Sequence, residues 1–146
     1  MMRIVTEIIH PDQLRAQLVN PGAGAYAAFE GWIRNENEGH RVVRLEYEAY
    51  DPLAVKEGEF VLREAALKFP VLQANCVHRT GMLEVGECAV WVGVAAAHRD
   101  EAFAACRFII DQVKVRLPIW KKEHYADGHS GWVNCERCAS GAGLGL

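Results

Sequence analysis

The 146-residue chain lacks the features that mark several broad classes of protein. Its net charge is -3, which argues against nonspecific nucleic-acid binding, since such binding needs an excess of Lys and Arg. The longest apolar run, Cys88 to Ala97, is about half of what a bilayer span requires. The N-terminus has no apolar segment of signal-peptide length. We therefore expect a cytoplasmic protein that binds neither nucleic acid nor membrane.

Motifs for several common chemistries are also absent. The chain has no dinucleotide fingerprint, no phosphate-binding P-loop, no zinc-protease helix motif and no serine nucleophile elbow. The cysteines number five, an odd set that argues against a disulfide framework. Cys135-x-x-Cys138 is half of a zinc motif, but no second pair exists and neither His124 nor His129 has finger spacing. We expect no metal, and a small zinc-binding domain stays open as an alternative.

Length and composition favour a single globular domain over residues 1–146. A chain of this size buries roughly 70% of its unfolded surface, so its core can form without disulfides or metal ions to stabilise it. Strand-like and helix-like segments alternate, which predicts an α+β fold with a mixed or antiparallel sheet and helices on one side. Residues 139–146 are small and Gly-rich, and we expect them to form a flexible tail.

Periodicity locates the main elements. Residues 41–50 alternate and predict a strand with Val43, Leu45, Tyr47 and Ala49 on one face, whereas residues 88–95 are nearly all apolar and predict a central strand. Residues 34–40 predict an irregular polar loop. Two long helices are expected, one over 51–68 and one beginning near His98. Their predicted apolar faces are Leu53, Phe60, Ala65 and Leu67 in the first, and Phe103, Cys106, Ile110 and Val113 in the second.

Cationic side chains gather at both ends of the second helix. His98 and Arg99 stand at its start, where free N–H groups attract anions and a guanidinium adds a bidentate contact. Lys114 and Arg116 lie in its last turn. A capping His, a surface Arg and cations that complement the helix dipole explain the same residues without a site. A helix of about 17 residues is ~25 Å long, so one site can use both ends only if the chain folds back or a second subunit contributes.

Two further positions leave their alternatives open. Lys121 and Lys122 follow Pro118-Ile119-Trp120, and in a strand Lys121 would share a face with Glu123 while Lys122 faces the other way. A Lys beside other cations is either a solvated charge or a base or nucleophile with an altered pKa. His78-Arg79 ends a predicted strand, where it joins the same pocket or caps the sheet edge.

Four sequence elements lie in order over about residues 25–134. They are Gly31-Trp32-Ile33-Arg34-Asn35, Val77-His78-Arg79-Thr80-Gly81-Met82-Leu83, Val92-Gly93-Val94 followed by Ala97-His98-Arg99, and Lys114-Val115-Arg116-Leu117-Pro118-Ile119-Trp120-Lys121-Lys122-Glu123. Together they resemble the large, catalytic subunit of molybdopterin synthase. The last two elements are the specific ones. The resemblance implies an α/β hammerhead core with an added β subdomain.

The resemblance also implies a reaction and its partners. Sulfur would pass from the C-terminal Gly-Gly thiocarboxylate of a small ubiquitin-like subunit to a cyclic pyranopterin monophosphate, forming the dithiolene of molybdopterin. The large subunit would be a homodimer with a small subunit at each end, a heterotetramer overall, and no cofactor is expected. The alternative is an anion- or nucleotide-binding module that carries out no chemistry.

The resemblance and the chemistry of the side chains together suggest roles. His98 and Arg99 would bind the substrate phosphate, joined by Arg34 across the dimer interface. Lys114 is the expected catalytic residue, which stabilises charge as sulfur attacks and oxygen leaves, and Lys121 would act beside it. The other residues expected to line the substrate pocket are Trp32, Ile33, Lys122 and Glu123. Trp32 and Lys122 depart from the family, which often has basic residues and Arg there, so a charge and a bidentate contact are lost.

Overall fold

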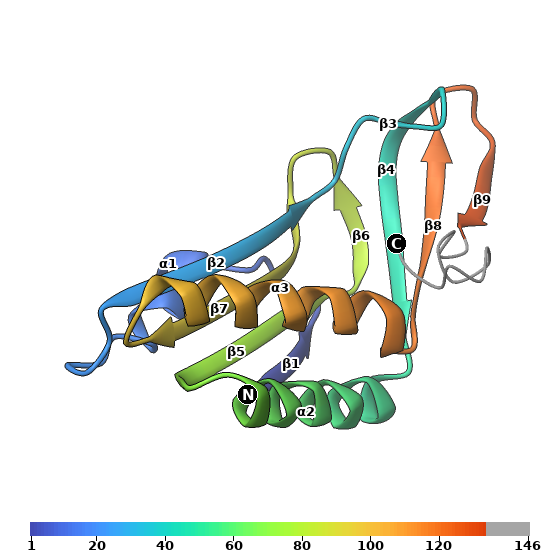
Figure 1. Ribbon diagram of the computed structural model, residues 1–146. Coiled ribbons are helices and arrows are strands. Elements are labelled where there is room, and N and C mark those ends of the chain that lie inside the picture. Colours follow the sequence, from blue (N-terminus) through green and yellow to red (C-terminus); the bar gives the residue numbers. More distant parts are fainter. Residues whose placement is uncertain (134–146) are drawn as a thin grey trace.

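The computed structural model describes residues 1–133 and shows two β-sheets that meet near the end of one long helix (Figure 1). The first sheet has four strands in the order β1-β5-β7-β2. Their bounds are Met2–Val5 for β1, Val71–Arg79 for β5, Cys88–Ala96 for β7 and Ala25–Trp32 for β2. β1 pairs in parallel with β5, and the other pairings are antiparallel. The expected mixed sheet, with residues 88–95 in an inner strand, is confirmed.

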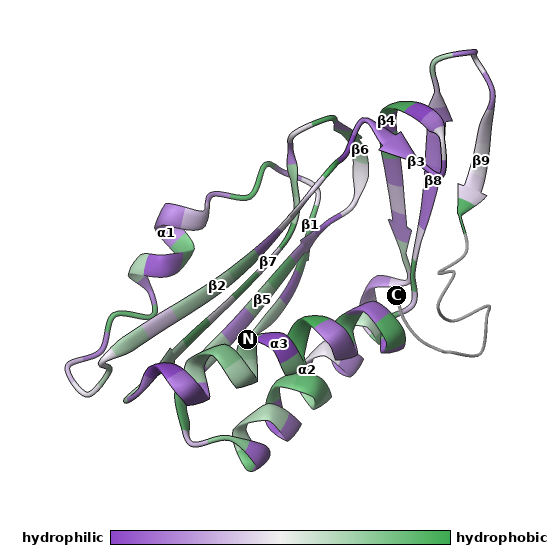
Figure 2. Ribbon diagram, turned by 45° about the horizontal axis from the view of Figure 1, so that its top comes forward, coloured by the Kyte–Doolittle hydropathy of each residue, from purple (hydrophilic) through white to green (hydrophobic). Residues whose placement is uncertain are grey.

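Helices cover both faces of this sheet. The long helices α2 (Asp51–Lys68) and α3 (Arg99–Arg116) lie on one face, and the short helix α1 (Pro11–Ala16) lies on the other (Figure 2). Because side chains alternate along a strand, β7 serves both layers: Val92 packs in the core with the long helices, whereas Trp91 packs with Leu14 and Leu18 on the α1 side. The expectation that helices lie on one side therefore holds for the long helices and is wrong for α1.

The second sheet is antiparallel and forms the added β subdomain. It contains β3 (Glu36–Asn37), β4 (His40–Ala49), β8 (Ile119–Tyr125) and β9 (Ser130–Val133) in that order, and β6 (Gly81–Glu84) also pairs with β4. A third cluster of buried residues lies between the two sheets and includes Leu45, Tyr47 and Leu83. This cluster makes the sheets one packed unit.

Residues 34–40 are not the irregular loop that the sequence predicts. Glu36 and Asn37 pair with Arg41 and His40, and the turn between them has positive φ at both central residues, 51° at Glu38 and 83° at Gly39. That is the geometry of a two-residue hairpin turn. Glu-Gly is a weaker signal for this turn than Asn-Gly, so the hairpin is not evident from the sequence.

The predicted buried faces of the helices are also partly wrong. Phe103 and Leu67 are 64% and 87% exposed, and Leu53 and Phe60 are 42% and 40% exposed. Ala65, Cys106, Ile110 and Val113 are buried as predicted, and five of the eleven buried positions in the two helices are Ala or Gly: Ala54, Gly58, Ala65, Ala102 and Ala105. A Cβ at Gly58 would collide with Met2 of β1, so close approach of the helices to the sheet favours small side chains over large ones. A bulge in β4 similarly buries Val42 more deeply than Val43.

Candidate active site

The C-terminal turn of α3 lies beside β4 and β8, at the junction of the two sheets (Figure 1). Only residues 117 and 118 separate α3 from β8, so a short segment of chain connects Lys114 in the helix to Lys121 in the strand. In the β4–β8 pairing, Lys121 stands opposite Tyr47 and Glu123 opposite Leu45. Paired residues in an antiparallel sheet share a face, and Tyr47 and Leu45 are buried. Lys121 and Glu123 therefore face the junction, as the alternation predicts.

Lys122 faces the other way. Its ammonium lies 5.6 Å from the centre of the Trp132 ring, with which it pairs across β8 and β9. Trp132 is half exposed, so this cation–π contact lies at the outer surface of the second sheet. Lys121 and Lys122, both predicted to line the pocket, thus lie on opposite faces of β8.

Glu123 is a buried carboxylate, with 3% of its surface exposed. It accepts a hydrogen bond of 2.8 Å from the Tyr125 hydroxyl and one of 3.2 Å from the Asn37 amide. The bond to Glu123 raises the pKa of Tyr125. Asn37 comes from the β3–β4 hairpin, so sequence reasoning, which took this segment as an irregular loop, missed it.

His78, at the end of β5, is buried in the same junction. Its ring lies edge-on to Tyr47, with 4.9 Å between the ring centres. Burial, opposed in part by a hydrogen bond to the Arg79 backbone and assisted by the positive charge of Lys114, lowers the pKa of His78 to about 4. Burial also raises the pKa of Tyr47 to about 12, with a contribution from Glu123. The charge of Lys114 thus acts on His78, which favours a place for His78 in the pocket over a cap at the sheet edge.

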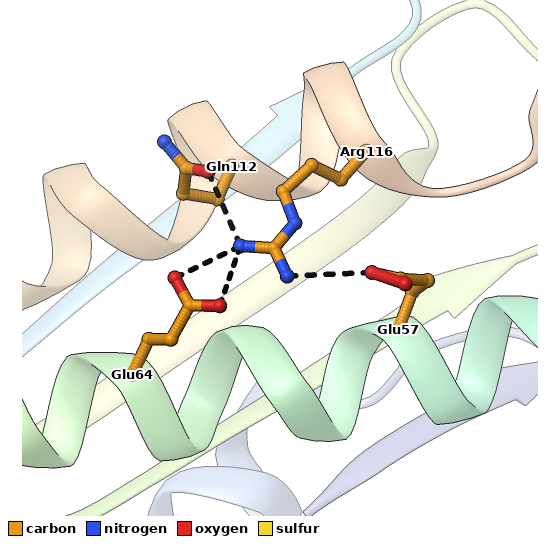
Figure 3. Close-up of polar contacts among 4 residues, drawn as sticks. All are labelled: Glu57, Glu64, Gln112 and Arg116. Carbon is orange, nitrogen blue, oxygen red and sulfur yellow. Dashed lines mark hydrogen bonds and ion pairs between the residues drawn. The ribbon is translucent and has the colours of Figure 1, made fainter.

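An ion-pair cluster holds the end of α3 against α2 (Figure 3). The Arg116 guanidinium lies 2.9 Å from the Glu64 carboxylate and 3.3 Å from that of Glu57. It also donates to the Gln112 side chain at 3.4 Å. The Arg116 side chain is therefore engaged in contacts between α3 and α2, and these contacts hold the helical turn that carries Lys114.

His98 and Arg99 lie at the opposite end of α3. The helix has 18 residues and is therefore ~27 Å long, and both side chains are exposed. His98 is the N-cap residue but makes no capping hydrogen bond with its side chain. Within one chain, the structure does not bring these two residues together with Lys114.

The segment around Arg34 leaves the first sheet and leads into the second. Ile33 is buried, and its backbone N–H and C=O are bonded to Glu87 and Gly86. Trp32 is 65% exposed, and its indole N–H donates to Glu30 at 2.9 Å. Arg34 is exposed. Ile33 thus packs in the core, while Trp32 and Arg34 present side chains to the surface.

Residues 1–133 contain no group of three or more His, Cys, Asp or Glu side chains arranged to hold a metal ion. Cys135 and Cys138, and the predicted tail over 139–146, lie outside the described residues. Over the same described part of the chain, no helix is long and apolar enough to cross a membrane.

Comparison with known families matches the model described as MoaE protein over residues 4–116. The chain belongs to this family. The match includes Lys114 but ends before Lys121 and Glu123, which longer matches to individual relatives cover.

Curated relatives and solved structures agree with this assignment. The molybdopterin synthase catalytic subunit of Thermoplasma volcanium is 40% identical over 90% of this chain and 96% of its own length. That of Pyrococcus abyssi is 44% identical, with 84% and 82% covered. The crystal structure of molybdopterin synthase from Staphylococcus aureus matches with a TM-score of 0.85 and 37% identity, over 90% of this chain and 95% of that one. The predicted family and fold class are confirmed.

Proposed function

We propose that this chain is the catalytic subunit of a molybdopterin synthase. It would transfer sulfur from the C-terminal thiocarboxylate of a small ubiquitin-like subunit to a cyclic pyranopterin monophosphate. The names of its relatives, and the coverage of most of their length, support this function. The assembly we propose is a cytoplasmic heterotetramer, with a homodimer of this chain at its centre.

The observation that carries the proposal is the β4–β8 register next to the end of α3. In this register Lys121 and Glu123 lie on the face that meets the first sheet. His78 lies in that sheet, and the positive charge of Lys114 contributes to its lowered pKa. The phosphate, the thiocarboxylate and the intermediates are all anionic, so a site with two lysines favours their binding. Glu123 accepts hydrogen bonds from Tyr125 and Asn37, which fix the position of its carboxylate in this junction.

Lys114 is our choice for the catalytic residue. As the thiocarboxylate sulfur attacks the pterin side chain, negative charge grows on the oxygen that leaves, and an ammonium at that position lowers the barrier. Lys121 would hold the thiocarboxylate end near Lys114. His98, Arg99 and Arg34 would bind the phosphate. Because α3 separates its two ends by ~27 Å, we place His98 and Arg99 of one subunit against Lys114 and Arg34 of the other.

Reconstitution with purified partners tests the proposal. The chain would be mixed with thiocarboxylated small subunit and the cyclic pterin, and dithiolene formation measured in a single turnover. We expect Lys114→Ala to lower the rate by about 100-fold or more while the homodimer stays intact in size-exclusion chromatography. Lys56→Ala, on the exposed side of α2, is the matched control and should react at the normal rate.

Two outcomes would contradict parts of this reading. Near-normal turnover by Lys114→Ala would remove Lys114 from the mechanism. Binding of both partners by the wild-type chain without any sulfur transfer would instead favour a binding module that carries out no chemistry.

A further inference from the structure

His78 has a defined protonation state. Its Nδ1 lies 2.8 Å from the backbone carbonyl oxygen of Arg79, and a carbonyl oxygen can only accept a hydrogen bond. Nδ1 therefore carries the hydrogen, and in the neutral ring the lone pair lies on Nε2. The tautomer is fixed by the local backbone, as second partners fix the rings of functional histidines.

The surroundings keep this ring neutral. Only 4% of the surface of His78 is exposed, and burial lowers its pKa to about 4, with the charge of Lys114 acting in the same direction. Tyr47 packs edge-on against the ring, and the pKa of that phenol is raised to about 12. At neutral pH His78 and Tyr47 are therefore both polar and uncharged.

We propose that His78 is a positioning residue that presents Nε2 as a neutral hydrogen-bond acceptor toward the Lys114 ammonium. This inference rests on the proposed function, because it assigns His78 a task only if Lys114 acts on the substrate. His78 faces the α3 side of the first sheet, since its β7 partner Val90 lies in the core beneath α2 and α3. The Nδ1–Arg79 bond holds the ring in one orientation.

A neutral acceptor has an advantage over a carboxylate at this position. An Asp or Glu beside Lys114 would cancel its charge and repel an anionic substrate. A histidine that stays uncharged restrains the ammonium and leaves its charge available to the phosphate, the thiocarboxylate and the developing oxyanion. Glu123, the carboxylate buried in the junction, already accepts bonds from Tyr125 and Asn37.

A pair of substitutions separates this role from simple packing. His78→Leu fills the space without an acceptor, whereas His78→Gln places an amide oxygen near the position of Nε2. We expect His78→Leu to lower kcat by about 10-fold or more, with KM for the pterin changed by less than about threefold, because the charge is kept but misplaced. His78→Gln should recover most of the rate. The matched control is Leu83→Ala, which opens a cavity in the neighbouring cluster and should lower the melting temperature with little effect on kcat.

A double-mutant cycle shows whether His78 acts through Lys114. In a Lys114→Ala background, adding His78→Leu should cause no further loss of the residual rate. A full additional loss, normal kcat in His78→Leu, or a Gln variant no better than Leu would overturn the inference. If the residual rate is too low to measure, the comparison of Leu with Gln decides. Normal turnover by Lys114→Ala alone would refute the proposed role of Lys114, and is distinguishable from these outcomes.

Discussion

At the scale of single residues, burial gives His78 and Glu123 opposite tasks. Glu123 is buried with two hydrogen-bond donors pointed at its carboxylate, which stabilise a charge that burial alone would disfavour. His78 is buried with a backbone carbonyl as its bonded neighbour and a lysine nearby, and both burial and the lysine favour the uncharged ring. The junction therefore holds one anchored negative charge, one neutral acceptor and the cationic side chains that would meet the substrate.

The low pKa of His78 predicts a pH dependence of stability. The pKa falls from 6.5 to about 4 on folding, so between these values the unfolded chain binds the additional proton. The stability contribution is complete above about pH 6.5 and is lost as the pH falls toward 4. Between pH 7.5 and pH 5, His78 should account for about 2 kcal/mol of lost stability.

Urea unfolding at the two pH values measures this loss. Wild type should lose about 2 kcal/mol more of its free energy of unfolding than His78→Leu does, with protein concentration held constant. Equal losses in the two proteins would show that His78 titrates normally in the folded chain.

At the scale of elements, α3 and β8 act as one unit because only residues 117 and 118 separate them. Arg116 secures this unit to α2 through Glu57 and Glu64 (Figure 3). The three side chains are partly exposed, between 27% and 46%, so solvent weakens each ion pair. The main effect of the cluster is to hold the last turn of α3, which carries Lys114, in position against α2.

Removal of this cluster should therefore affect both stability and catalysis. We expect Arg116→Met to lower the free energy of unfolding by about 1 kcal/mol and to slow sulfur transfer several-fold, because the turn that carries Lys114 is less restrained. Arg107→Met is the matched control, since Arg107 pairs with Asp111 on the same helix at 2.9 Å but is 80% exposed. That control should change stability by less than about 0.5 kcal/mol and leave turnover unchanged. Equal effects of the two substitutions, measured by urea unfolding and single-turnover kinetics, would contradict this role.

The sequence predicts the strands of this fold better than the buried faces of its helices. Alternation in β4 and the apolar run of β7 locate both strands, and alternation in β8 correctly places Lys121 and Glu123 on one face. The helix faces are predicted only in part, because hydrophobicity alone favours Phe103 and Leu67, whereas close packing against the sheet places alanine or glycine at about half of the buried positions. Which helix residues are buried depends on the distance between layers, and that distance is a property of the whole fold.

Part of the candidate site was equally hidden from the sequence. Tyr47 looks like an ordinary core residue in its strand, and its contact with His78 arises only when the two sheets pack together. Asn37 joins Glu123 across 86 positions in the chain, through a hairpin whose turn residues give a weak signal. The candidate site residues that could be predicted are those in a sequence motif, whereas the residues that contact them were found only in the structure.

At the scale of the whole molecule, the cationic residues stand at opposite ends of α3. A single subunit cannot bring Arg99 and Lys114 to one substrate, since 15 residues of helix separate their backbones by ~22 Å. Two subunits related by a twofold axis can, since the same surface of each then faces the other. Each pocket of the proposed homodimer would take Lys114 from one subunit and Arg99 from its partner.

Hybrid dimers test this arrangement. Lys114→Ala and Arg99→Ala subunits would be co-expressed with different affinity tags, and the mixed dimer isolated. One of its two pockets would then combine an intact Lys114 with an intact Arg99 from the other subunit. We expect about half of the wild-type activity at limiting pterin concentration, although either homodimer alone is nearly inactive.

A second hybrid gives the opposite result and makes the test decisive. In a dimer of wild type with the double variant Lys114→Ala/Arg99→Ala, a pocket shared between subunits always lacks one of the two residues, so activity should be nearly abolished. A pocket built within one subunit would instead keep about half of the activity in this hybrid and show none in the first. Only the shared arrangement reconciles the length of α3 with a single substrate that contacts both of its ends, and the two hybrids distinguish it by which of them is active.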